Sequence, residues 1–369
     1  MGNMGRGHAE YLLDNKVKNA QLVALCDIEP ITDEKYKNLK YFDNYKDLID
    51  SGCVDAVIVA TPHYSHTYIG EYALSKGIHT IVEKPISVSK ADCERLISAH
   101  KDKKVIFTAM FNQRTREPYQ KLKELVGSLG KLQRLTCICT DWYRTQAYYN
   151  SSSWRASWVG EGGGTLLNQC PHQLDMIIWL CGMPKTVYAN LTFGKFHNID
   201  VEDEVNAIFT YENGAIGSFI ASTGEYPGTN LLEIEGEMGK LSFSDGVIKI
   251  WKNDQSCIEY SQKTVEASKE KKAKTSANYF TVPKVHYEEI KFEEDVYFLN
   301  QHCAITQNFV NAILFDEPLI SPAEDGIKSV ELANAMIMSH IKGEKITVPI
   351  DSFEYEKILN SLKEKEVKK

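Results

Sequence analysis

Three features that many proteins carry are missing from this chain of 369 residues. No apolar stretch is long enough to cross a bilayer, which predicts a protein with no membrane partner. Positive charge is not in excess, because the formal net charge is −8, and this argues against a nucleic-acid partner. The nine cysteines are scattered, mostly inside apolar runs, so we expect buried thiols in a reducing cytoplasm, with neither a disulfide framework nor a metal site.

A buried first strand is also missing from what is otherwise a nucleotide-binding pattern. The pattern opens with Gly2-Asn3-Met4-Gly5, and the apolar spacing up to Asp14 predicts a helix. Glycines let a backbone approach a pyrophosphate, and a helix amino terminus offers free N–H groups. The strand and first glycine that normally come before are absent. We expect either a start at an internal methionine or a sheet with two exposed edges in its middle. A third interpretation makes Gly2 and Gly5 a flexible end with no cofactor role.

An acidic residue follows the next predicted strand, Leu22–Cys26. Asp27 lies 22 residues after Gly5, which is the spacing at which a carboxylate accepts hydrogen bonds from ribose hydroxyls. Such a carboxylate repels a 2′-phosphate, and the residue after it is Ile28 rather than arginine. The sequence therefore predicts NAD as the cofactor, with NADP possible.

Two turns are expected at the carboxyl ends of buried strands, where open parallel sheets bind ligands. Glu83-Lys84-Pro85 follows the predicted strand His79–Val82, and its proline prevents the strand from continuing. We expect Glu83 and Lys84 to lie beside the cofactor. Thr61-Pro62 ends the predicted strand Ala56–Ala60, and His66 follows it. Cofactor contact and plain helix packing explain His66 equally well.

The apolar pattern changes near residue 118 and divides the chain. Residues 1–118 alternate short strands with helices, which predicts a parallel, Rossmann-type NAD(P)-binding domain. Residues 119–350 have longer, partly alternating strands, which predict an α/β substrate domain with an open, mostly antiparallel sheet. Within that domain we expect an exposed excursion at 261–284 and an amphipathic helix from Ala323 to Met338. Residues 351–369 are predicted to be a charged tail.

A second chemical cluster follows three consecutive glycines, residues 162–164. Asn168, His172 and Asp175 are spaced four and three apart, so one continuous helix would place them on one face. A histidine presented in this way beside a cofactor domain is a candidate general base. The alternative is a core histidine whose hydrogen bond goes to Asp175.

Aromatic and basic residues precede the glycines and suit a carbohydrate. Rings stack on sugar faces, while arginine and glutamine donate hydrogen bonds to hydroxyls. The predicted substrate contacts in this loop are Tyr143, Arg144, Tyr148, Trp154 and Arg155. Asn168, His172 and Asp175, after the glycines, are predicted substrate contacts as well. For Trp154 and Trp158 the alternative is packing at the domain junction. After the predicted strand Val105–Phe111, Asn112 is expected near nicotinamide, and Gln113 and Arg114 near substrate.

On these residues the chain resembles the glucose–fructose oxidoreductase / inositol dehydrogenase / rhizopine catabolism (Gfo/Idh/MocA) family. The resemblance covers nearly the whole length, and Glu83-Lys84-Pro85 with the block from Gly162 to Asp175 makes it specific. It implies a Rossmann domain and an α/β domain whose open sheet carries substrate residues and forms a homodimer or homotetramer. It also implies that Lys84 hydrogen-bonds the reacting hydroxyl and that His172 takes its proton. Asn168, the third catalytic position, is commonly aspartate in the family, and asparagine cannot exchange a proton at neutral pH.

Three functions are compatible with these residues. The first is NAD(P)-dependent dehydrogenation of a secondary hydroxyl on a sugar, glycoside or inositol. The second uses bound NAD transiently, because oxidation to a keto sugar permits elimination of a glycosidic bond before NAD is regenerated. The third is a sensor or regulatory protein that binds NAD without turnover. The retained Lys84 and His172 favour an enzyme.

Overall fold

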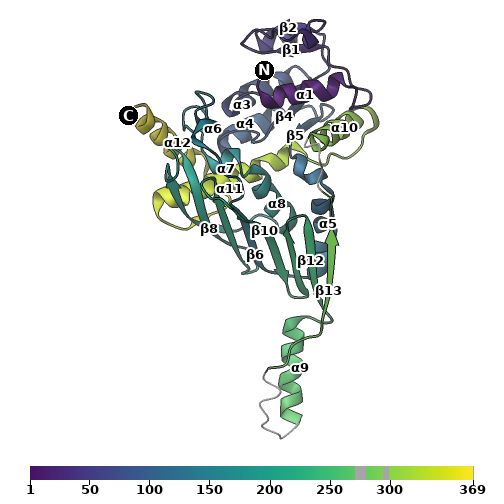
Figure 1. Cartoon of the computed structure of the whole chain (residues 1–369), viewed down its shortest axis with the longest axis vertical. Coiled ribbons are helices and arrows are strands. Elements are labelled where there is room, and N and C mark those ends of the chain that lie inside the picture. Colours follow the sequence, from purple (N-terminus) through teal and green to yellow (C-terminus); the bar gives the residue numbers. More distant parts are fainter. Residues whose placement is uncertain (271–279, 294–298, 369) are drawn as a thin grey trace.

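The computed structural model describes residues 1–270, 280–293 and 299–368. An N-terminal part built on short parallel strands lies at one end, and a broad nine-stranded sheet lies at the other (Figure 1). None of the described helices is long and apolar enough to cross a membrane.

The N-terminal strands are all paired in parallel but belong to two separate sheets. Their bounds are β1 Ala24–Cys26, β2 Lys40–Phe42, β3 Ala56–Val59, β4 His79–Val82 and β5 Phe107–Ala109. The pair β1-β2 stands apart from the trio β3-β4-β5, and no strand of the described residues joins them. The expected break in the middle of the sheet is therefore present, with one edge on β1 and the other on β3.

The N-terminal helices connect these strands, and α3 and α4 begin shortly after the carboxyl ends of β3 and β4. Their bounds are α1 Asn3–Leu13, α2 Tyr45–Asp50, α3 His63–Ser75, α4 Lys90–Ala99 and α5 Glu117–Val126, with 3-10 turns at Glu34–Tyr36, Asn112–Thr115 and Gly127–Leu129. The Ser89 hydroxyl caps α4 by accepting from the Asp92 N–H. The first turn of α1 has no side-chain cap, since Gly2 stands at its N-cap.

The large sheet is mostly antiparallel, as predicted. Its order is β13-β12-β11-β10-β6-β9-β8-β7-β14, and only β6 and β9 pair in parallel. The bounds are β6 Leu132–Cys139, β7 Thr186–Phe193, β8 Glu202–Thr210, β9 Ile216–Ser222, β10 Asn230–Gly236, β11 Gly239–Ser244, β12 Val247–Asn253, β13 Val285–Lys291 and β14 Ile346–Thr347. Burial alternates along β7 and β8, so one face is covered and the other is open.

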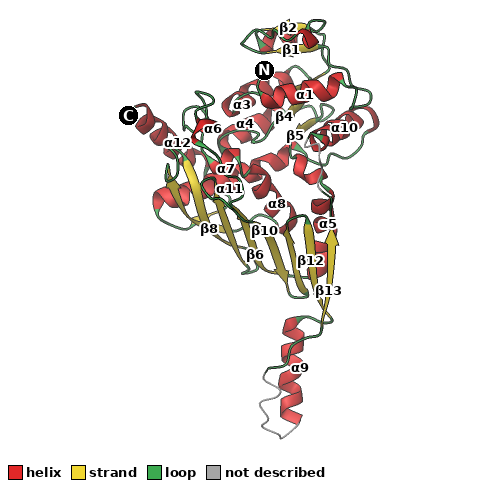
Figure 2. Ribbon diagram, viewed as in Figure 1, coloured by secondary structure: helices red, strands yellow, loops and turns green. Residues whose placement is uncertain are grey.

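Helices from the second half cover the inner face of the sheet and also reach the N-terminal strands (Figure 2). Their bounds are α6 Gln146–Tyr149, α7 Thr165–Asn168, α8 Pro171–Cys181, α9 Cys257–Glu270, α10 Asn300–Phe315, α11 Ala323–Lys342 and α12 Ser352–Val367. The main chain before α11 returns to β5, where the Ala109 N–H donates to the Ser321 carbonyl. The two halves of the chain are therefore interleaved rather than merely linked.

Three predictions for this half need correction or limitation. Helix α11 is not amphipathic through its second half, because residues 329–339 are all buried between β7, α8, α4 and β5. Most of the predicted charged tail is helix α12, which buries Tyr355, Leu359 and Leu362. The predicted excursion at 261–284 begins as α9, which projects from the sheet in Figure 1, while 271–279 lie outside the described residues.

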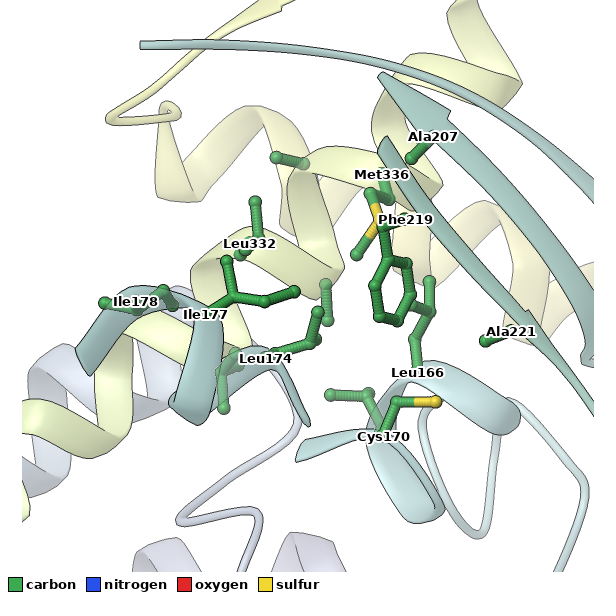
Figure 3. Close-up of a cluster of buried hydrophobic side chains, with 14 of the residues drawn as sticks. Leu166, Cys170, Leu174, Ile177, Ile178, Ala207, Phe219, Ala221, Leu332 and Met336 are labelled. Carbon is green, nitrogen blue, oxygen red and sulfur yellow. The ribbon is translucent and has the colours of Figure 1, made fainter. Parts of the chain in front are cut away.

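The core beneath the candidate site joins α7, α8, α11 and the sheet. Figure 3 shows Leu166, Leu174, Phe219 and Met336 converging, and each is essentially inaccessible to solvent. The same cluster continues to Val82 at the end of β4. Because cores pack as densely as crystals, this contact holds the glycine–histidine block rigidly against the end of β4.

Candidate active site at the end of strand β4

Lys84 lies at the carboxyl end of β4 and reaches across to the second half of the chain. Its Nζ donates a hydrogen bond to the main-chain oxygen of Asn168 over 2.9 Å. Burial lowers the pKa of Lys84, while the charges of Glu83 and Glu161 act in the opposite direction. The lysine is thus fixed in direction and made a better proton donor than an exposed lysine.

Glu83, predicted to lie beside the cofactor, is held by hydrogen bonds within the protein. Its Oε1 accepts from His8 Nε2 at 2.8 Å, and its Oε2 accepts from the Lys84 N–H. His8 in turn lies 2.6 Å from the Tyr11 hydroxyl, which contacts Thr306 of α10. Burial alone would raise the pKa of Glu83, but the His8 hydrogen bond and neighbouring positive charges bring it down to about 2. Glu83 therefore ties α1, β4 and α10 together behind Lys84.

His172 is the second buried proton-transfer candidate. It lies in the first turn of α8, edge-on to Phe111 at 6.3 Å between ring centroids. Burial and the nearby charge of Lys84 hold its pKa well below the usual range, so the ring is neutral and able to accept a proton. Its Nδ1 is buried without a hydrogen-bond partner. Buried polar atoms are seldom left unpaired, so this nitrogen is a candidate contact for a ligand.

Asp175 does not satisfy His172, and the expected single helical face is wrong. Asn168 ends α7, and Pro171 opens a separate helix, α8, because proline is favoured in a first helical turn but not inside a helix. Asp175 instead accepts two hydrogen bonds from Arg114, at 2.6 and 2.9 Å. Arg114 also bonds Asp325 at 2.8 Å. Arg114 and Asp175, predicted to bind substrate, are buried in a structural ion pair that holds α8 and α11 to the end of β5.

The predicted cofactor residues gather at the strand ends that open to solvent. Gly2, Asn3, Met4 and Gly5 form the start of α1, and Asp27 follows β1. Thr61 and Pro62 are exposed after β3, and Ile28 is fully on the surface, with 86% of its area accessible. Asp27 Oδ2 lies 2.8 Å from the Met1 amino group, and its Oδ1 accepts the Glu29 N–H.

These residues fit a dinucleotide. The α1 amino terminus is uncapped, and a Cβ added at Gly2 would meet no atom within 4 Å, so the backbone there is open to a phosphate. Asn112 is buried, and its Oδ1 has no partner although its Nδ2 donates to Gln301. An acceptor of this kind suits a carboxamide N–H. Gly2 and Gly5 would therefore approach the pyrophosphate in the middle of the cofactor, Asn112 the nicotinamide end, and Asp27 a ribose.

For His66 the structure supports packing rather than cofactor contact. Its two ring nitrogens each lie 2.7 Å from a main-chain oxygen, one of Thr61 and one of Pro85. A neutral ring can donate to one of these at a time, and burial lowers the pKa of His66. The imidazole thus links the turns that end β3 and β4.

The predicted substrate loop forms a ladder of alternating arginines and rings. Arg144 lies over Trp142 and Tyr148, and Arg155 lies over Tyr148 and Trp154, with 4.4 to 5.3 Å from guanidinium to ring centre. Arg155 also donates to the Tyr148 hydroxyl at 2.6 Å. Such stacking fixes long side chains that would otherwise be mobile.

The tryptophans of this region meet other parts of the chain. Trp154 contacts His63 of α3, and Trp158 is buried and donates from its Nε1 to the Asp200 carbonyl. Trp154 therefore lies between the two halves of the chain, whereas the Trp158 ring packs within the second half against Phe193. Tyr143 is half exposed beside Tyr226.

A cleft of about 230 Å³ opens next to the ladder. Gln113 and Arg144, both predicted to bind substrate, line it. Its other lining residues were not predicted: Arg116, Tyr119, Asp141, Trp142, Gln173 and Asn230. Lys84 and His172 do not line this cleft. Gln173 does line it, and Gln173 directly follows His172 in the sequence.

Glu161, which precedes the three glycines, was missed. Its side chain is 1% exposed, accepts the Ala156 N–H at 2.6 Å and accepts a hydrogen bond from the Asn168 amide. Burial raises the pKa of Glu161 to about 7. The available sequence signal for Glu161 was a charged residue next to a run of glycines. The burial of Glu161 depends on α3 and β8, which the local sequence does not reveal.

Two family descriptions match the chain. Residues 1–111 match "Oxidoreductase family, NAD-binding Rossmann fold", and residues 119–242 match "GFO/IDH/MocA C-terminal domain". The chain belongs to the Gfo/Idh/MocA family. This confirms the resemblance, the NAD-binding Rossmann fold and the α/β second domain.

Curated relatives of this family include sugar and inositol dehydrogenases. A levoglucosan dehydrogenase from Pseudarthrobacter phenanthrenivorans is 27% identical, covering 54% of this chain and 58% of the relative. A myo-inositol 2-dehydrogenase from Thermotoga maritima is 28% identical, covering 67% and 74%. The match spans less than two thirds of the first of these relatives.

Solved structures of the family share the fold. The WlbA dehydrogenase from Bordetella pertussis, solved with NADH and UDP-GlcNAcA, superposes with a TM-score of 0.75 at 24% identity, over 95% of this chain and 97% of that one. A levoglucosan dehydrogenase solved with NADH and L-sorbose gives 0.76 at 20% identity, over 94% and 97%.

Proposed function

We propose that this Gfo/Idh/MocA member is an NAD-dependent dehydrogenase that oxidises a secondary hydroxyl of a sugar, glycoside or inositol. The observation that carries the proposal is the pair Lys84 and His172. His172 is buried and Lys84 is partly buried at the ligand edge of an NAD-binding fold. The pKa values of both are lowered, and His172 Nδ1 has no hydrogen-bond partner. Buried, pKa-shifted groups in such a place are typical of proton transfer.

The residues divide the reaction between them. The nicotinamide, when bound, supplies the acceptor for the hydride, that is, for the carbinol hydrogen with both electrons of its C–H bond. His172, neutral in the resting protein, accepts the hydroxyl proton at Nδ1 as the C=O bond forms. Lys84 donates a hydrogen bond to the same oxygen and stabilises the negative charge that develops there. Asn168 holds the lysine through its main-chain oxygen.

A polyhydroxylated substrate fits the surface beside this pair. Arg144 and Arg155, held by stacking on Tyr148, place guanidinium donors next to one another. The neighbouring cleft adds Gln113 and Gln173, whose amides can both donate and accept. The names of the curated relatives, which include inositol and levoglucosan dehydrogenases, support the same class.

We also propose that the open sheet face forms a homodimer or homotetramer. Tyr188, Ile208 and Ile216 on this face are 48 to 54% exposed. Large apolar side chains lying on a flat sheet typify a protein contact. Sedimentation of the wild type and an Ile208→Lys variant tests this, and an unchanged assembly would refute it.

The activity is tested by supplying NAD with a panel of monosaccharides, methyl glycosides and inositols and following NADH absorbance. NADH formation with one class supports the proposal and identifies the substrate. Release of the aglycone from a glycoside without net NADH would support redox-neutral cleavage instead. NAD binding measured by calorimetry, with no turnover of any compound, would favour a sensor.

A further inference from the structure

Glu161 is a buried carboxylate for which the proposed reaction has no use. It lies in the loop between Trp158 and the glycines, and each of its carboxylate oxygens accepts one hydrogen bond. Oε2 accepts the Ala156 N–H, and Oε1 accepts the side-chain amide of Asn168. Arg155 stands at 3.9 Å from Oε1. Burying a carboxylate costs free energy unless its charge is paired or hydrogen-bonded, so the burial of Glu161 requires a reason.

Asn168 connects this carboxylate to the lysine. Its side-chain Nδ2 donates to Glu161, and its main-chain oxygen accepts from Lys84 Nζ at 2.9 Å. Asn168 therefore contacts both Glu161 and Lys84. A shift of the Asn168 side chain would also move its main-chain oxygen, which is the acceptor that orients Lys84. The connection is also electrostatic, because the charge of Glu161 raises the pKa of Lys84 against the effect of burial.

We propose that Glu161 is a positioning residue for Lys84, which it orients through Asn168 and keeps protonated through its own negative charge. The inference rests on the proposed dehydrogenase function of the same site. When Glu161 takes up a proton, the Asn168 amide loses its charged acceptor and Lys84 loses a compensating charge. Turnover should therefore rise with pH as Glu161 ionises, near pH 7, where burial places its pKa.

The other ionisable groups around Glu161 do not account for that rise. His63, which contacts the Glu161 main-chain oxygen, has its pKa held well below the usual range by burial, and His172 likewise. Arg155 and Lys84 are the facing cations. Glu202 of β8 is the remaining carboxylate, and burial raises its pKa to about 7 as well. Glu202 accepts the Gly164 and Leu166 N–H groups and has no hydrogen bond to Asn168 or Lys84.

Glu202 is therefore a matched control for a test by pH-dependent kinetics. In Glu161→Gln the amide is nearly the same size, and Asn168 can flip to bond it, so the main change is lost charge. We expect kcat to fall by roughly 100-fold, as for a misplaced catalytic group, with KM for NAD unchanged and the rise near pH 7 abolished. Glu202→Gln should keep that rise, since its single oxygen can still accept both N–H groups. If the rise of kcat near pH 7 persists in Glu161→Gln, or disappears only in Glu202→Gln, the proposal is overturned.

A second pair of measurements separates positioning from simple loss of structure. Asn168→Ala removes the connecting amide, so the double variant should lose little more than Glu161→Gln alone, which removes both the connection and the charge. Fully additive losses would overturn the connection. The labelling rate of Lys84 by an amine-reactive reagent, followed by peptide mass spectrometry against pH, needs no turnover. It should show a lower Lys84 pKa in Glu161→Gln even if the dehydrogenase function fails, and an unchanged pKa would refute the electrostatic part.

Discussion

Glu83 offers the sharpest test of how the site is built, because its carboxylate joins three elements behind the catalytic lysine. The pKa of Glu83 falls from 4.5 to about 2 in the folded chain. One pKa unit corresponds to about 1.36 kcal/mol, so ionised Glu83 contributes at most about 3 kcal/mol to the free energy of unfolding. A folded-state pKa below the unfolded value means that this stability is present above pH 4.5 and lost as the pH falls toward about 2.

The perturbation is Glu83→Gln, which keeps an acceptor for His8 but removes the charge. At neutral pH, urea unfolding should show a loss of about 2 to 3 kcal/mol relative to wild type. Below about pH 4.5 the wild type should lose stability relative to the variant by about 1.4 kcal/mol per pH unit, so the two curves should converge. Near-UV circular dichroism at each pH would verify that the variant starts from a native fold.

Glu202→Gln is the matched control, because both glutamates are buried but their pKa values move in opposite directions. Burial raises the pKa of Glu202 to about 7, so wild type loses stability as the pH rises from 4.5 through 7. The variant has no such penalty and should gain relative to wild type over that range. Parallel stability curves for wild type and Glu83→Gln from about pH 3.5 to 7 would refute the role assigned to Glu83.

Three further outcomes are expected. Lys84→Ala should reduce turnover by roughly 10²- to 10⁴-fold while NAD affinity by calorimetry stays within a modest factor; unchanged turnover would remove Lys84 from the mechanism. Asp27→Ala should weaken NAD binding by about tenfold or more, because charge-assisted hydrogen bonds to ribose are lost, and should reduce discrimination against NADP; equal NAD affinity would remove Asp27 from the cofactor site. Gly164→Ala should cost about 1–3 kcal/mol of stability in urea, since its Cβ would meet the Glu202 carbonyl oxygen; an unaffected midpoint would contradict the close packing described for this loop.

Much of the site followed from local sequence, because a strand end and a turn are short-range features. Four N-terminal strands were predicted within a few residues of their observed bounds, and the second sheet was predicted to be mostly antiparallel. Lys84 was expected at the carboxyl end of β4, because an apolar run followed closely by a proline predicts a strand that ends there. His172 was expected beside the glycines because three consecutive glycines predict a tight turn before a helix.

Only the tertiary structure decided what the polar side chains do. Arg114 was expected near substrate, and its ion pair with Asp175, 61 residues away, forms only in the folded chain. Glu83 was expected beside the cofactor, and its pairing with His8, 75 residues earlier, likewise depends on the fold. The sequence by itself determined where the chain turns and which residues can carry protons, since these depend on neighbours along the backbone. Which charges are buried, paired or left open depends on segments far apart in the chain, and only folding brings those segments together.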